Sequence, residues 1–151
     1  MKRTSNLWLL ALLLGALAAC SNHSKQLVGK WSCELRGEGF SGTLDDTYVQ
    51  DGTSHGMRVI EFTAGEIKGA EFLLSATSTW EFREGKLCET MVDAKITAKN
   101  AKARVVENAV GGDLSSLLAT KRLSSCEDFV FAGNTLTRTD DYGNVTTCQR
   151  Q

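Results

Sequence analysis

Residues 72–82 read FLLSATSTWEF and decide how this chain folds. A β-strand points alternate residues to opposite faces. Here one face holds apolar and small side chains, namely Phe72, Leu74, Ala76, Ser78, Trp80 and Phe82. The other face is mainly polar, with Thr77, Thr79 and Glu81. A period of two over this length predicts a half-buried strand rather than a helix.

The residues that follow predict a partner for this strand. Glu84-Gly85 separates it from a second alternating run, in which Cys88, Thr90, Val92, Ala94 and Ile96 are expected to share a face. Glycine supplies the positive φ that a tight turn needs. The two runs are therefore predicted to form an antiparallel hairpin.

The same pattern recurs along the chain. Residues 27–36 alternate with Trp31, Cys33 and Leu35 on one face, and further runs follow at residues 57–63, 127–132, 135–139 and 144–150. A short helix is expected at residues 114–119, where Asp113 is a plausible N-cap. Strands joined by short turns predict an all-β fold, an antiparallel meander closed into a small barrel of about eight strands with one short helix.

Length and charge limit the range of functions that this chain can have. The chain has 151 residues, 42% of them hydrophobic, no proline and a formal net charge of −1. This length predicts one compact domain. Nucleic-acid partners are not expected, because proteins that bind them gather Lys and Arg on one surface.

The first nineteen residues are typical of an export signal. Lys2 and Arg3 precede residues 7–19, an apolar run of 13 residues that is too short for a bilayer of about 30 Å. The run ends Leu17-Ala18-Ala19-Cys20, which closely resembles the lipobox of bacterial lipoproteins. We therefore expect a signal peptide at residues 1–19, a lipidated Cys20 with a polar tether over residues 20–26, and one folded domain over residues 27–151.

The lipobox resemblance also implies a location. Acyl chains on Cys20 would hold the protein on a membrane, since each buried CH₂ group adds about 0.8 kcal/mol. In lipoproteins of this type, Asp after the lipidated cysteine favours retention in the inner membrane. This chain has Ser21 there, which implies the outer membrane with the domain facing the periplasm.

Four cysteines remain after Cys20, and an oxidising compartment makes two disulfides the expected state. Spacing alone leaves three pairings open. The first and last strands of a meander barrel meet where it closes, so we predict Cys33–Cys148 and, by remainder, Cys88–Cys126. Cys33 alternates with apolar neighbours but Cys148 with polar ones, so a bulge or a strand end is expected to align them.

Gly29-Lys30-Trp31 in the first strand is similar to the GxW signature of lipocalins and lipocalin-like domains. The hairpin expected over residues 133–147 looks like the closing hairpin of such domains. This resemblance implies that Trp31 plugs the closed end of a barrel. Two interpretations of the large aromatic side chains stay open, because they could fill the core or line an apolar pocket, namely Trp31, Phe72, Trp80 and Phe82.

No residue pattern predicts catalysis, a cofactor or a metal. Motifs for nucleophiles, phosphate binding and nucleotide binding are absent from the sequence. His23 lies in the tether, and His55 is interpreted as a solvated loop residue because no ligand spacing accompanies it. Two acidic pairs are interpreted as turn residues rather than Ca²⁺ ligands, Asp45-Asp46 and Asp140-Asp141.

Three hypotheses for the function follow. The first is a lipoprotein that binds a small apolar ligand or lipid inside a lipocalin-like barrel. The second is a protein-interaction lipoprotein of the envelope, either an assembly accessory or an enzyme inhibitor. The third, an enzyme, is not expected. Residues 45–56 are predicted to form a loop at the open end whose rim, with Tyr48 and Met57, contacts the ligand or partner.

Overall fold

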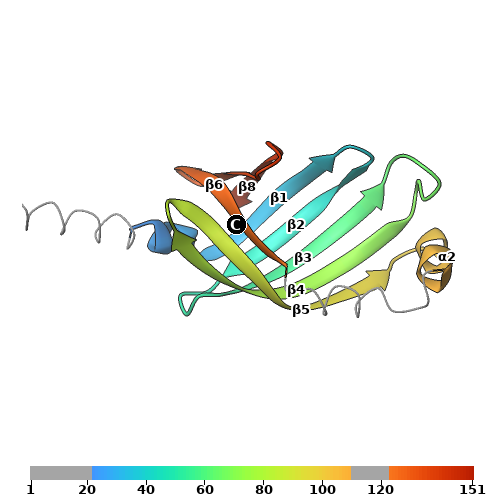
Figure 1. The fold of residues 1–151 in the computed structure, drawn as a ribbon, viewed down its shortest axis with the longest axis horizontal. Helices are drawn as coiled ribbons and strands as arrows, with labels where there is room; N and C mark the ends of the chain where they lie inside the picture. Colours follow the sequence, from blue (N-terminus) through green and yellow to red (C-terminus); the bar gives the residue numbers. More distant parts are fainter. Residues whose placement is uncertain (1–21, 110–122) are drawn as a thin grey trace, which may run out of the picture.

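The computed structural model describes residues 22–109 and 123–151, and it confirms the predicted closed antiparallel barrel of eight strands (Figure 1). Each strand pairs with the next along the chain, and the last pairs with the first. The strands are β1 (Gly29–Gly37), β2 (Phe40–Tyr48), β3 (Thr53–Phe62), β4 (Glu71–Arg83), β5 (Lys86–Ala98), β6 (Ser124–Ala132), β7 (Thr135–Thr139) and β8 (Val145–Arg150). The expected signal peptide, Cys20 and the helix expected at residues 114–119 lie outside the described residues.

The hairpin predicted around Glu84-Gly85 joins β4 to β5. Both residues have positive φ, 53° for Glu84 and 79° for Gly85. Two such residues in succession give the turn whose twist matches that of the flanking strands. The strands pair from Arg83↔Lys86 to Phe72↔Ala98, which makes this the longest ladder of the barrel.

The face predicted for β5 is wrong over its first part. A bulge makes Thr77 pair with Asp93 and Ser78 pair with Met91, so that Val92 has no partner on β4. An extra residue reverses the alternation that follows it. Cys88 and Thr90 therefore lie on the outer face, whereas Ala94 and Ile96 face the interior, and Val92 is exposed.

The barrel has two unlike halves. Among the residues that the structure describes, β6 pairs with β5 over Leu87–Thr90, and β8 pairs with β1 over Trp31–Glu34. We call the part enclosed by all eight strands the eight-strand half. Beyond it, β1–β5 continue past the ends of β6 and β8, and we call this part the five-strand half (Figure 1).

The main hydrophobic core fills the eight-strand half. Its largest fully buried side chains are at most 2% exposed: Leu27, Trp31, Tyr48, Leu87, Leu136 and Cys148. A polar tether is expected over residues 20–26, but residues 22–27 are helical and end on Leu27, which is fully buried. His23 in this helix packs against three rings of the barrel, with centroids 5.2 to 6.2 Å away: Phe82, Phe129 and Phe131.

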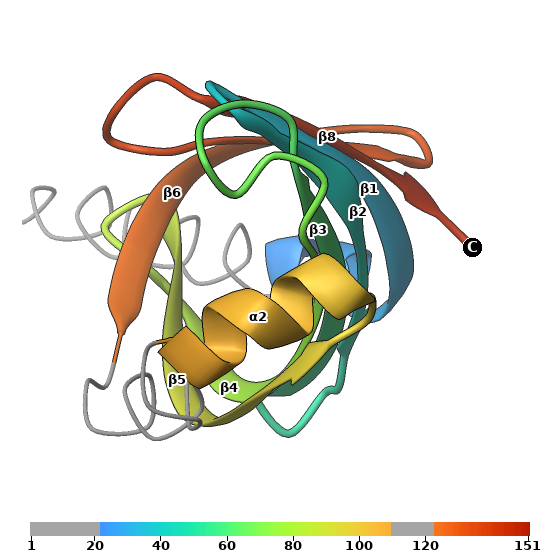
Figure 2. The same cartoon turned by 90° about the vertical axis from the view of Figure 1, so that its right-hand side faces the viewer.

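A second, smaller core lies in the five-strand half under helix α2 (Ala101–Ala109). This helix crosses the end of the barrel (Figure 2) and buries Ala103 beside Ala70 and Phe72. Asn100 caps its first turn, since its Oδ1 accepts the amide of Ala103 at 2.9 Å. No helix within the described residues is long and apolar enough to cross a bilayer.

Both predicted disulfides are confirmed. Cys33–Cys148 joins β1 to β8, and Cys88–Cys126 joins β5 to β6. The expected bulge between β1 and β8 is wrong, because Trp31 pairs directly with Arg150 and Cys33 with Cys148. Arg150 faces the interior like Trp31, so the two cysteines already point the same way.

Candidate functional site

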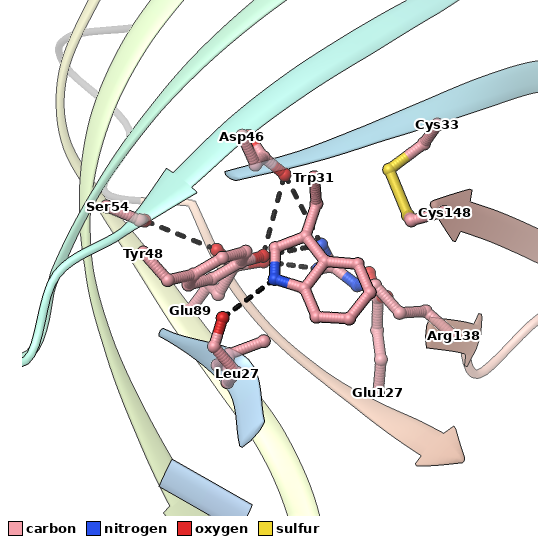
Figure 3. Close-up of polar contacts among 10 residues, drawn as sticks. All are labelled: Leu27, Trp31, Cys33, Asp46, Tyr48, Ser54, Glu89, Glu127, Arg138 and Cys148. Atoms are coloured by element: carbon pink, nitrogen blue, oxygen red, sulfur yellow. Dashed lines mark hydrogen bonds and ion pairs between the residues drawn. A yellow bond between two sulfur atoms is a disulfide. The ribbon is translucent and has the colours of Figure 1, made fainter. Parts of the chain in front are cut away.

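The main polar site is a charged cluster inside the eight-strand half, centred on Arg138 of β7 (Figure 3). Arg138 Nε donates to Glu127 Oε2 at 2.7 Å, and its Nη1 donates to the Tyr48 hydroxyl at 2.9 Å. Nη1 also lies 3.6 Å from Asp46 Oδ2, and Nη2 donates to Glu89 Oε2. Three carboxylates from three strands thus surround one buried guanidinium. We call these five residues the Arg138 cluster.

Protonation in the Arg138 cluster follows from burial. Burial raises the pKa of Asp46 to about 6, and the negative charge of Glu89 adds to this, while Arg138 and Arg58 oppose it. Burial also raises the pKa of Tyr48 well above its ordinary value. Burial alone would lower the pKa of Arg138, but Tyr48 and the surrounding carboxylates hold it well above its usual range. Asp46 therefore changes charge near neutral pH.

The placement predicted for Tyr48 is wrong. Residues 45–56 are not one loop, because β2 runs to Tyr48 and β3 begins at Thr53. Tyr48 faces the interior, is 2% exposed, and donates to Asp46 Oδ2 at 3.5 Å. Leu44, Asp46 and Tyr48 alternate as a strand face does, and the polar residues around them obscured that signal.

Met57, the other predicted rim residue, lies on the opposite face of the barrel wall. It is 54% exposed and borders a groove of about 690 Å³ on the outer surface of β1–β5. His55 borders the same groove and lies on strand β3 rather than in a loop, with Nδ1 3.3 Å from Thr77 Oγ1. Tyr48 and Met57 therefore do not form one rim.

The closed end of the barrel is locked around Trp31. Its indole Nε1 donates to the carbonyl oxygen of Leu27 at 2.7 Å, and the Arg150 guanidinium lies 4.4 Å from the ring centroid. Arg150 Nη1 also donates to the Val28 carbonyl at 2.9 Å. The helix at residues 22–27, the first strand and the last strand are thus fastened together at one point.

The aromatic residues mostly fill the core rather than line a pocket. Trp31 and Trp80 belong to the main core and Phe72 to the second. Phe82 packs against the main core and remains partly buried. The Trp80 indole donates to the Thr53 carbonyl at 2.8 Å, which fixes the ring in place.

The interior is less filled in the five-strand half. The strand registers place Arg58, Leu74 and Ile96 side by side on β3, β4 and β5, all facing inward. Ile60, two residues after Arg58 on β3, is the next residue of that strand to face inward. These side chains are only half-buried. Ile60 and Leu74 belong to neither core cluster and keep part of their surface accessible to solvent.

Arg58 is the cation of this region. Within the described residues it makes no hydrogen bond and no ion pair, although its charge acts on Asp46. The residues beside it are small, since Gly56, Ala76 and Ala94 form the adjacent inward-facing row. A β-carbon on Gly56 would lie only 2.3 Å from Asp46 Oδ1, so the Asp46 carboxylate takes the space that a side chain at position 56 would need.

The two acidic pairs have different places in the fold. Asp45 and Asp46 point to opposite faces of β2. Asp140 closes the turn between β7 and β8 by accepting the amides of Tyr142 and Asn144 at 2.9 and 2.8 Å. Throughout residues 22–109 and 123–151, no three His, Cys, Asp or Glu side chains gather closely enough to hold a metal ion.

The chain matches none of the protein-family models or curated proteins with which it was compared. Fold and site together define it as a small, disulfide-braced antiparallel β-barrel with a buried charged cluster. This fold is compatible with a ligand-binding barrel.

Proposed function

We propose that this protein is a lipoprotein of the outer membrane, facing the periplasm, that binds a small apolar ligand or lipid inside its barrel. One observation carries the binding proposal. Ile60, Leu74 and Ile96 face inward in the five-strand half and keep accessible surface. The largest side chains of the main core in the eight-strand half, such as Trp31 and Tyr48, are buried. Apolar surface left open inside a rigid wall gains free energy when an apolar ligand covers it.

The small inward-facing row supports the same proposal. Gly56, Ala76 and Ala94 lie beside the half-buried Leu74 and Ile96, so small residues adjoin the apolar lining. The Gly29-Lys30-Trp31 signature and the position of Trp31 at the closed end agree with a lipocalin-like binder. The pattern Leu17-Ala18-Ala19-Cys20 supports the anchor.

The binding test uses N-phenyl-1-naphthylamine, a neutral probe that fluoresces in apolar surroundings. The soluble domain is expected to bind it. Ala76→Phe places a ring in the interior and should weaken binding tenfold or more. Thr79→Phe puts the same ring on the outer face of the same strand, where the side chain is exposed, and should leave binding unchanged. Equal binding by both variants, or none by the wild-type domain, would contradict the proposal.

The anchor is tested separately in cells. Palmitate should label the wild-type protein in the outer-membrane fraction, and Cys20→Ser should abolish the label. Ser21→Asp should move the labelled protein to the inner-membrane fraction. Membrane association without any label in the wild-type protein would contradict lipidation.

A second candidate, binding of an envelope protein, rests on the outer groove. Its volume of about 690 Å³ and the exposed Met57 at its border offer a contact surface outside the barrel. A photocrosslinking residue at position 57 should then capture one discrete partner, whereas the same residue at the exposed position of Val92 should not.

A further inference from the structure

We propose that the barrel takes an anionic amphiphile, a single-chain carboxylic acid, whose headgroup pairs with Arg58 and whose chain lies against Ile60, Leu74 and Ile96. This inference rests on the proposed function and names the ligand class. It starts from Arg58 and Arg138, two inward-facing arginines that have opposite surroundings.

Arg138 is fully satisfied by this chain. It faces three carboxylates and a tyrosine hydroxyl, and its side chain is 6% exposed. A further anion there would meet Asp46, Glu89 and Glu127 at close range and be repelled. The Arg138 cluster therefore serves the fold rather than a ligand.

Arg58 has the opposite character. It faces the interior, is half-buried, and has no hydrogen bond or ion pair within the described residues. Its neighbours across the sheet are Leu44 and Leu74, which offer it no acceptor. Asp46 is near enough to feel its charge, but that carboxylate already interacts with Tyr48 and Arg138.

An unpaired cation among apolar side chains is costly, because it loses hydration without gaining a partner. A carboxylate from a ligand provides two acceptor oxygens in the geometry that a guanidinium prefers. The inward-facing Ile60, Leu74 and Ile96 offer an apolar surface to the rest of the ligand. One molecule with an acid group and a hydrocarbon chain satisfies both features at once.

The eight-strand half fixes where such a ligand stops. Trp31, Tyr48 and Trp80 are buried in the main core and fill the interior beyond Asp46. The hydrocarbon chain is therefore expected in the five-strand half, toward Phe72 and α2.

The test compares 11-(dansylamino)undecanoic acid with its methyl ester, which has no charge and one additional methyl group. The wild-type domain should bind the acid at least tenfold more tightly, which corresponds to about 1.4 kcal/mol. Arg58→Met keeps a long side chain without the charge. It should bring the acid down to the affinity of the ester and leave ester binding within about twofold of wild type.

The matched control is Arg36→Met, whose side chain lies on the exposed outer surface. It should bind both probes as the wild-type domain does. Equal wild-type affinity for acid and ester, or unchanged acid binding in Arg58→Met, would overturn the Arg58 site and leave the proposed binding function standing. Binding of neither probe by the wild-type domain would overturn both. The ratio of the wild-type affinities for the acid and the ester is measured without any variant, so the test holds even if a variant fails to fold.

Discussion

Strands β1–β5 run through both halves of this barrel but serve a different purpose in each. In the eight-strand half, Trp31 and Tyr48 are 1% and 2% exposed, and the charges around Arg138 are paired. In the five-strand half, Leu74 is half-buried and Arg58 is unpaired within the described residues. In the described part of the chain, β6–β8 enclose the first half and do not extend along the second. The comparison teaches that stability should depend on the first half and ligand capture on the second.

The largest effect is expected from the bridge that closes the eight-strand half. Replacing Cys33 and Cys148 with Ser should lower the free energy of unfolding by about 5 kcal/mol, since the bridge closes a loop with a sequence separation of 115. The matched pair Cys88→Ser and Cys126→Ser opens a loop of separation 38 and should cost about 4 kcal/mol. Urea denaturation measures both, and a larger loss for the shorter loop would contradict the argument.

The next effect distinguishes Arg138 from Arg58. Arg138→Met should cost about 3–5 kcal/mol, because it leaves buried carboxylates without their cation. Arg58→Met removes no ion pair and should change stability by less than about 1 kcal/mol. Thermal and urea unfolding of the two variants decide the matter. Similar losses in both would erase the distinction between the two halves.

Two leucines on the same inward-facing row, one on β2 and one on β4, should show a smaller contrast in stability. Leu44 is 3% exposed in the main core, so Leu44→Ala should cost about 2–5 kcal/mol. Leu74→Ala should cost about 1 kcal/mol, because water already reaches that side chain. The same Leu74→Ala variant should nevertheless weaken binding of the neutral probe. A stability loss at Leu74 equal to that at Leu44 would show that the five-strand half is filled.

The smallest predicted effect is the pH dependence of the Arg138 cluster. The pKa of Asp46 rises from 3.8 to about 6 on folding, so between these values the folded protein binds more protons than the unfolded chain. Its contribution to stability is therefore full at low pH and is lost as the pH rises through about 6. Lowering the pH from 7 to 5 should add about 1 kcal/mol through this group.

Asp46→Asn is the control for that effect, because its side chain does not titrate. The variant should lose the part of the pH slope between 5 and 7 that Asp46 causes, as chemical unfolding at several pH values would report. An unchanged slope would assign the titration to another group.

Sequence patterns predicted the fold where alternation was regular. The run from Phe72 to Phe82 gave a strand, and closure of a meander gave both disulfides. The bulge at Val92 escaped prediction because nothing in the local pattern marks an extra residue. Helix α2 escaped too, although Asn100 before a run of Ala, Lys and Arg is a readable N-cap signal.

The interior site was harder to predict than the fold. Asp46, Glu89, Glu127 and Arg138 come from four strands, and each is an ordinary surface residue by type. Only the registers show that they converge. Tyr48 was assigned to a loop for the same reason, because acidic residues both precede and follow it in the sequence, as is common in loops. Charged residues at inward positions of an alternating run are the signal to follow.

The Cys33–Cys148 bridge also decides what a protease can release from this protein. Any single cut between residues 33 and 148 leaves one fragment with Cys33 and the other with Cys148, and the disulfide still joins them. Only the few residues after Cys148 can be shed from the C-terminal end by one cut. A nicked chain therefore travels as one covalent molecule on a non-reducing gel, and fragments separate only after a reductant is added.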